Sequence, residues 1–145
     1  VIDSEKVFKS LDAYNEALTK LDELGKEYQA EVDSRYKSIE SLYNSYMTQK
    51  STLSESTRAS IEQQILSKEE AAQKYQQEVF GENGTLMKKR VELIKPIQEK
   101  VFAAIEAYAK ANGFDLAIDK ASNTTLLYFN SALDRTTQII EELKK

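Results

Sequence analysis

Residues 11–53 read LDAYNEALTKLDELGKEYQAEVDSRYKSIESLYNSYMTQKSTL, and apolar side chains recur in this stretch at alternating spacings of three and four residues. The positions on this ladder are Leu11, Tyr14, Leu18, Leu21, Gly25, Tyr28, Val32, Arg35, Ile39, Leu42, Tyr46, Gln49 and Leu53. Ten of these thirteen are apolar or aromatic, whereas most residues between them are charged or polar. A period of 3.5 residues over about six heptads predicts a coiled-coil seam. About 40 helical residues would reach about 60 Å, longer than a compact domain of this size.

The ladder ends in a run of small hydroxyl residues at 51–57, which favour caps and turns. Thr52, with Glu55 three residues later, predicts the cap of a second helix. The apolar residues expected to face the first helix are Ile61, Ile65, Ala72, Tyr75, Val79 and Leu86. We therefore expect a long antiparallel hairpin with its tip near 51–56.

The returning segment contains a break in its pattern, because the apolar stripe restarts one position later after Leu86. Gly81 and Gly84 lie just before this shift and Pro96 lies after it. Each glycine costs about 1 kcal/mol in a helix interior, and proline kinks a helix. Two interpretations are open: a hinge at Gly81 and Gly84 within a bent helix, or a short loop between two helices. A hinge predicts that alanine at both sites would stiffen the helix.

Residues 112–145 and the first residues of the chain predict a small head. Asn112-Gly113 should end the returning helix, and the alternation in 114–119 predicts a strand. A turn at 120–124 would lead to an antiparallel partner at 125–129, and Asp134 could cap a last helix. Val1-Ile2 reads like the remnant of a further strand, so we expect a processed N-terminus.

The predicted fold is mainly α with a small β head, into which the long antiparallel coiled-coil hairpin is inserted. The head would span about 1–20 and 95–145, and the arm about 21–94. So small a sheet buries little apolar surface and leaves an open edge, which predicts oligomerisation through the head. The apolar residues expected to hold the oligomer are Phe114, Leu116, Ile118, Leu127, Phe129, Ile139, Ile140 and Leu143.

Composition argues against several classes of function. Cysteine and histidine are absent from the sequence, which removes thiolate nucleophiles, disulfides and the commonest metal ligand. Two glycines occur in 81–84, but no phosphate-binding Gly-Lys-Ser/Thr follows them. The net charge of −4 is spread along the chain, unlike the clustered basic residues of nucleic-acid binders. We expect no enzyme, cofactor, metal, nucleic acid or transmembrane segment.

Tyrosines along the hairpin divide into two groups. Tyr28, Tyr46 and Tyr75 occupy seam positions, so they are expected to support the coiled coil. Tyr36 and Tyr43 lie one step off the seam and seven residues apart, hence on one face of the helix. Tyrosine offers broad amphipathic contact, and the thioether of nearby Met47 adapts to varied partners. We interpret Tyr36, Tyr43 and Met47 as a surface that binds client polypeptides.

Two short motifs in the sequence resemble those of a known protein family. Ile2-Asp3-Ser4 running into Val7-Phe8, and Gly113-Phe114-Asp115-Leu116-Ala117-Ile118-Asp119 after the returning helix, resemble motifs of the Skp/OmpH family of periplasmic chaperones. The order of elements agrees with that family over nearly the whole chain. The resemblance implies a periplasmic homotrimer, exported with a signal peptide that is then removed. Its heads would form a β-rich body, and its three hairpins would enclose unfolded outer-membrane proteins without ATP.

The resemblance also implies peripheral contact with the membrane. A lipopolysaccharide site of the family is placed at an adjacent basic pair, which corresponds to Lys88 and Lys89, with Arg90 beside them. This chain departs from the strongly basic familiar member, because its sequence pI is near 5.1. A mechanism that needs positive arms is therefore in doubt here.

Two other functions fit the same pattern. The hairpin could serve a structural coiled-coil adaptor that clamps one folded partner, or a cytosolic holder resembling prefoldin. Binding of one native protein but of no unfolded ones would favour the adaptor. A cleavable signal peptide in the full-length gene would separate the periplasmic chaperone from the cytosolic holder.

Overall fold

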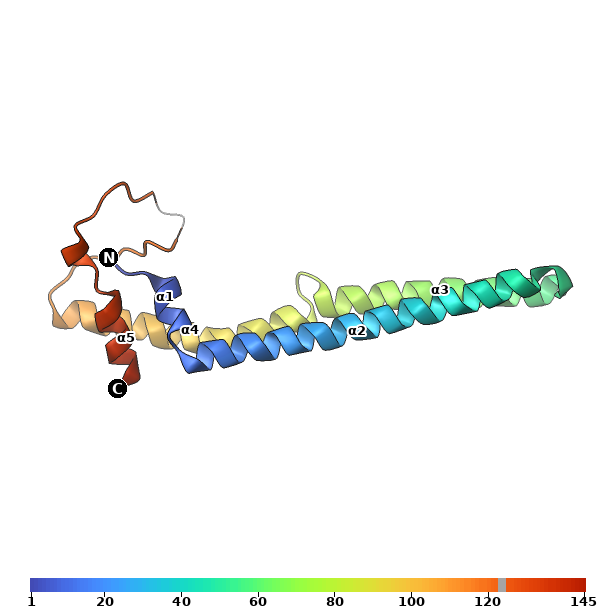
Figure 1. The fold of residues 1–145 in the computed structure, drawn as a ribbon, viewed down its shortest axis with the longest axis horizontal. Coiled ribbons are helices and arrows are strands. Elements are labelled where there is room, and N and C mark those ends of the chain that lie inside the picture. The colour runs from blue at the N-terminus through green and yellow to red at the C-terminus, as the bar shows by residue number, and fades with distance from the viewer. Residues whose placement is uncertain (123–124) are drawn as a thin grey trace. The chain divides into compact units, whose positions relative to one another are not determined.

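The computed structural model describes residues 1–122 and 125–145 and is dominated by helices (Figure 1). Its helices are α1 (Ser4–Lys9), α2 (Asp12–Gln49), α3 (Glu55–Phe80), α4 (Thr85–Ala111) and α5 (Thr136–Lys144), with 3₁₀ turns η1 (Lys50–Thr52) and η2 (Ser131–Leu133). The chain forms two compact units, which we call the head (Val1–Lys20 with Arg90–Lys145) and the arm (Leu21–Lys89). The helical hairpin of the predicted fold class is confirmed.

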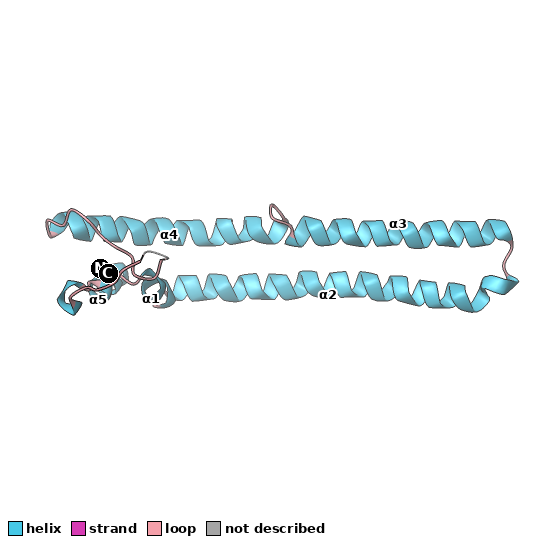
Figure 2. Cartoon of the chain, turned by 90° about the horizontal axis from the view of Figure 1, so that it is seen from above, coloured by secondary structure: helices cyan, strands magenta, loops and turns pink. Residues whose placement is uncertain are grey.

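Within the arm, α2 and α3 run antiparallel and side by side (Figures 1 and 2). The predicted seam forms the core of the arm, with Ile39 and Tyr46 of α2 packed among Ile65 and Ala72 of α3. Leu42, Leu53 and Ile61 pack against this cluster and are partly buried. The seam therefore follows from the 3.5-residue period of the sequence.

Arg35 is a charged residue on this apolar ladder, and its contacts explain how the seam accommodates it. Its guanidinium lies over the ring of Tyr75, 4.1 Å from the ring centroid. The same group forms an ion pair with Glu31 at 3.0 Å, one turn earlier on α2. A guanidinium stacked on an aromatic face keeps its polar edge free for hydrogen bonds. Arg35 thus fills a seam position without leaving its charge unpaired.

The tip of the hairpin differs in detail from the sequence prediction. The residue that caps α3 is Ser54, whose hydroxyl accepts a hydrogen bond from the Thr57 amide at 3.2 Å. Thr52, predicted as the cap, instead ends η1 and donates its hydroxyl to the Gln49 carbonyl. Residues 50–54 connect α2 to α3, and they overlap the tip expected near 51–56. Both residues are small hydroxyl residues, so spacing alone did not decide between them.

The head has its own apolar core, in which Val7, Val101 and Ile139 are completely buried beside Ile2. Phe8, Leu11, Ile105, Tyr108, Ile140 and Leu143 pack around this cluster. The cluster joins α1, α4 and α5 to the N-terminal residues. Three of its members are residues predicted to hold an oligomer, namely Ile139, Ile140 and Leu143. Ile139 is completely buried and Ile140 and Leu143 are partly buried within a single head, and a role of these residues in an oligomer stays a prediction.

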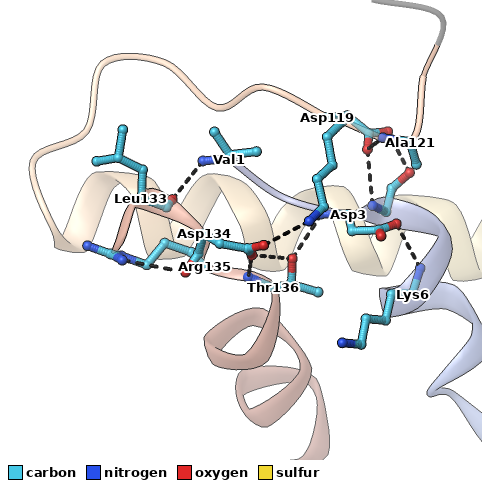
Figure 3. Close-up of polar contacts among 11 residues, drawn as sticks. Val1, Asp3, Lys6, Asp119, Ala121, Leu133, Asp134, Arg135 and Thr136 are labelled. Atoms are coloured by element: carbon cyan, nitrogen blue, oxygen red, sulfur yellow. Dashed lines mark hydrogen bonds and ion pairs between the residues drawn. The ribbon is translucent and has the colours of Figure 1, made fainter. Parts of the chain in front are cut away.

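The N-terminal residues lie between two segments that are distant in sequence (Figure 3). On one side Ile2 donates to the Ile118 carbonyl and accepts from the Lys120 amide, both at 2.8 Å. On the other side the Val1 nitrogen donates to the Leu133 carbonyl, and its carbonyl accepts from the Arg135 amide. The N-terminal segment thus forms backbone hydrogen bonds with residues 118–120 on one side and with residues 133–135 on the other.

The β structure predicted for the head is not seen in the part of the chain that the structure describes. Ile2 and Asp119 form an isolated parallel bridge, and no strand is assigned at 114–119 or 125–129. The predicted turn at 120–124 includes residues 123 and 124, which lie outside the described residues. Alternating side chains indicate an extended backbone, but a strand also needs a neighbouring backbone for its hydrogen bonds. The small β head therefore remains a prediction.

Candidate functional site

One side of the arm carries exposed apolar side chains that take no part in the seam. Tyr36, Tyr43 and Met47 are 37%, 49% and 49% exposed, and they share one face of α2. We call this side of the arm the tyrosine face. On α2 it comprises Asp33, Tyr36, Glu40, Tyr43 and Met47, and on α3 it comprises Glu62, Leu66, Glu69, Gln73, Gln76 and Phe80. The three residues predicted to bind clients are thus available on one surface.

The opposite side of the arm has a different chemistry. Ser34 and Ser38 of α2 line a shallow groove with Ala71 of α3, which shows that these residues share one side of the hairpin. A neighbouring groove is lined by Leu42, Ser60, Gln63, Gln64, Ser67 and Lys68. We call this side, defined by Ser34, Ser38, Ser41 and Ser45 with Ser60, Gln64, Ser67 and Ala71, the serine face. The residues on the other side of the seam, opposite the serine face, therefore share the tyrosine face.

Two exposed apolar residues of α3 extend the tyrosine face and were not predicted from sequence. Leu66 is about as exposed as Tyr43, and Phe80 is as exposed as Tyr36. Phe80 meets the ring of Tyr28 edge-on, with 6.4 Å between the ring centroids. A signal was present: Leu66, Gln73 and Phe80 recur at sevens beside the seam, in the same register as Tyr36 and Tyr43. The seam residues of α3 alone do not reveal this second repeat.

Tyr46 belongs to the seam, as predicted, and also links the two helices by a polar contact. Its ring is buried, and its hydroxyl donates a hydrogen bond to the carboxylate of Glu62. This bond raises the pKa of the Tyr46 hydroxyl, because ionisation would place a phenolate against a carboxylate. The ammonium of Lys50 lies 5.9 Å from the ring centroid. The contact holds Glu62 beside the seam at the edge of the tyrosine face.

Residues 81–84 form a loop between α3 and α4, so the second of the two interpretations is the one observed. The Gly81 amide donates to the Gln77 carbonyl at 2.8 Å, and the Gly84 amide donates to the Gly81 carbonyl at 2.9 Å. A Cβ at Gly84 would lie 2.8 Å from the Glu78 carbonyl oxygen, and one at Gly81 would overlap the Gln77 carbonyl. The two glycines are required by close backbone contacts. A hinge motion at this loop remains a prediction.

Replacing Gly84 with alanine should therefore destabilise the protein, by about 1–3 kcal/mol, because its Cβ would press on backbone atoms that cannot turn away. Gly25→Ala is a matched control. Gly25 lies inside α2, and a Cβ there would meet only Leu86 Cδ2 at an ordinary 3.8 Å. The control should stabilise the protein by roughly 0.5–1 kcal/mol. Urea unfolding followed by circular dichroism, at equal protein concentration, would measure both; a higher midpoint for Gly84→Ala would contradict the loop geometry.

The head presents a second exposed apolar surface. Leu127 is 92% exposed and Leu116 is 75% exposed, and Phe114 and Leu133 are also exposed. Phe114, Leu116 and Leu133 line a cavity of about 400 Å³, whose walls are mostly apolar. Among its lining residues are Ile2, Ile105, Tyr108, Phe114, Leu116 and Ile118. Of the residues predicted to hold an oligomer, Phe114, Leu116 and Leu127 are thus exposed, whereas Ile118 and Phe129 are half-buried.

Two aspartates organise the polar contacts of the head (Figure 3). Asp134 accepts hydrogen bonds from the hydroxyl and the amide of Thr136 and pairs with Lys120 at 3.0 Å, and these contacts hold the Asp134 pKa well below its usual range. It therefore supports the start of α5, although the N-cap residue is Arg135 and not Asp134 as predicted. For Asp119, burial raises the carboxyl pKa, but hydrogen bonds from Ser4 and Ala121 outweigh it and lower the pKa. Both groups are structural.

The basic residues Lys88, Lys89 and Arg90 lie in the first turns of α4. Lys88 and Arg90 are exposed, and Lys89 is half-buried. Consecutive residues of a helix point about 100° apart, so the three side chains do not share one face. Within the described residues, no helix is long and apolar enough to cross a bilayer. Contact of these residues with lipopolysaccharide remains a prediction.

Comparison with known proteins identifies a family. Residues 1–143 match the sequence model of a family described as outer membrane protein (OmpH-like). No curated protein matches the chain. The family match spans the head and the arm alike, and therefore includes both exposed apolar surfaces.

Proposed function

The chain belongs to the OmpH-like family, and from this premise we propose that it is an ATP-independent holdase chaperone of the periplasm. Its clients would be unfolded outer-membrane proteins or other proteins of the cell envelope, held between helical arms. Families of this kind act as chaperones, which agrees with a chain that lacks cysteine and histidine for catalysis.

The observation that carries the proposal is the tyrosine face of the arm. The arm already has a closed seam, so Tyr36, Tyr43 and Met47 are not needed to join its helices. An unfolded client presents no fixed pattern of charge or shape, but it always exposes apolar side chains. Burial of apolar surface, at about 25 cal/mol per Å², is therefore the attraction that transfers from one client to the next. Exposed tyrosine and methionine side chains provide apolar surface for such contacts. Tyrosine also loses little conformational freedom when it binds.

A homotrimer is the assembly that we propose. The head exposes Leu116, Leu127 and an apolar cavity, and soluble proteins seldom leave a large apolar patch uncovered. No helix or strand is assigned at 114–118, and the backbone groups of residues 115–117 form no hydrogen bond with the other described residues, so they can pair with another chain. The β body predicted from sequence would then form between copies. Three copies would place three arms around one client.

The proposal predicts that the purified chain suppresses aggregation of an unfolded β-barrel membrane protein when urea is diluted away. Suppression should require no ATP and should be complete at roughly one trimer per client, because the client would be enclosed as a whole. Light scattering of the diluted mixture measures it. A chain that leaves aggregation unchanged, yet retains a single folded protein from an envelope extract, would support the structural adaptor instead.

A further inference from the structure

The tyrosine face combines apolar side chains with carboxylates in a regular order. Along α2 its residues follow one another at spacings of three and four, as Asp33, Tyr36, Glu40, Tyr43 and Met47. Along α3 the order is Glu62, Leu66, Glu69, Gln73, Gln76 and Phe80, at the same spacings. These eleven positions hold four carboxylates and no basic residue. Tyr36, Tyr43 and Leu66 therefore each have a carboxylate of the face three or four residues away, whereas Met47 and Phe80 do not.

The charge of this face is not neutralised within the chain. Asp33 accepts a hydrogen bond from the Gln29 amide, and Glu62 accepts one from the Tyr46 hydroxyl; both donors are neutral groups. Among the residues that the structure describes, neither Glu40 nor Glu69 has an ion pair, and both are exposed. A row of uncompensated carboxylates gives the face a negative potential.

The serine face shows the contrast. Its defining residues are serines, one glutamine and one alanine, and the charged residues that line its grooves are the basic Arg35 and Lys68. Glu27 and Glu78 continue the serine face by one heptad, but exposed large apolar side chains interspersed with carboxylates are, on the described α2 and α3, a feature of the tyrosine face. A partner that fits the tyrosine face must offer apolar groups for the rings and positive charge for the carboxylates.

We propose that the tyrosine face selects unfolded segments in which aromatic or aliphatic residues are interspersed with lysine or arginine. This inference rests on the proposed holdase function and names the class of client segment. Apolar contact supplies most of the attraction, and the carboxylates decide between segments of equal apolar content. Segments rich in aspartate and glutamate are disfavoured, because like charges repel at short range.

The test uses the full chain and two unstructured, dye-labelled peptides. The peptides have equal length and equal tyrosine and leucine content. At the remaining sites one peptide contains lysines and the other contains glutamates. Fluorescence anisotropy at about 0.05 M salt should show the lysine peptide binding at least about threefold more tightly. The difference should shrink at about 0.5 M salt, where exposed charges are screened beyond a few ångströms.

Two variants locate the effect on the arm. Glu40→Gln with Glu69→Gln should reduce the preference for the lysine peptide about threefold, because the lysine peptide loses attraction and the glutamate peptide loses repulsion. The control is Glu27→Gln with Glu78→Gln. These glutamates lie seven residues before Ser34 and seven after Ala71, on the serine face. Both pairs change the net charge equally, from −4 to −2. The control should keep the preference.

The outcomes separate the two proposals. Equal binding of both peptides by the wild-type chain, or an equal loss of preference in both double variants, would overturn the charge selection but leave the holdase function intact. Failure to bind either peptide, together with failure to suppress aggregation, would overturn both.

Discussion

Replacing Leu116 and Leu127 with aspartate should dissociate the assembly into single chains. The wild-type protein should have about three times the chain mass of 16.5 kDa, and the double variant should have that mass alone. The two leucines are largely exposed in the single chain, so aspartate should cost its fold little. Six carboxylates buried without partners in the interface would cost several kcal/mol each, more than such an assembly can sustain. Size-exclusion chromatography with light scattering measures the mass.

The controls separate loss of assembly from loss of fold. Leu66→Asp changes an exposed leucine of the arm, and should leave the mass unchanged. Aspartate at Ile139 is unsuitable, because that side chain is completely buried in the core of the head and its loss would unfold the chain. Helical circular dichroism should be the same in the wild type and in the Leu116, Leu127 variant. A wild-type protein that is monomeric at micromolar concentration would refute the trimer.

The arm could be predicted from sequence because a single periodic signal defines it. Each heptad places apolar residues at the same two positions, so a single exception such as Arg35 does not disturb the seam. The contact of the Arg35 guanidinium with the Tyr75 ring accommodates the charged residue there. The two faces beside the seam follow the same period. The position of Tyr36 and Tyr43 was therefore predictable, and that of Leu66 and Phe80 was equally encoded although it was missed.

The head was less predictable, because its structure depends on contacts between distant residues. Ile2 pairs with residues 118 and 120, and Val1 pairs with residues 133 and 135. No local sequence pattern predicts this pairing between distant residues. The alternation of apolar and polar residues in 114–119 predicts only an extended backbone. Whether an extended segment becomes a strand depends on a neighbouring backbone, which in an oligomer can belong to another chain.

The loop at 81–84 shows a third limit. Glycine at two nearby positions is compatible with a flexible hinge and with a tightly packed turn, because either one favours a residue without a Cβ. The carbonyls of Gln77 and Glu78 decide between the two, since they leave no space at Gly81 and Gly84. Such a close approach is visible only in three dimensions. The hinge interpretation predicts that alanine would stiffen the helix, whereas the contacts at Gly84 predict that alanine would destabilise the protein.

The triple change of Tyr36, Tyr43 and Met47 to serine should weaken client holding by tenfold or more. If each side chain buries about 50 Å² against a client, the loss is roughly 1 kcal/mol per residue, and three such losses exceed the 1.4 kcal/mol that corresponds to tenfold. The three residues lie outside the seam core, so the melting temperature should change little. Aggregation of an unfolded β-barrel protein, titrated with each variant, gives the ratio of affinities.

The matched control replaces residues of the serine face, as Ser38→Ala with Ser45→Ala, and should hold clients as well as the wild type. Moderate salt should change holding of a mixed client by less than the triple variant does, because screening acts on exposed charges and leaves apolar burial intact. Full activity of the triple variant would remove the tyrosine face from client binding. Loss of holding in salt, with the triple variant unaffected, would show that charge alone holds the client. The expected pattern, a large loss in the triple variant and a small one in salt, makes apolar contact the main attraction and leaves the carboxylates the role of choosing among apolar segments.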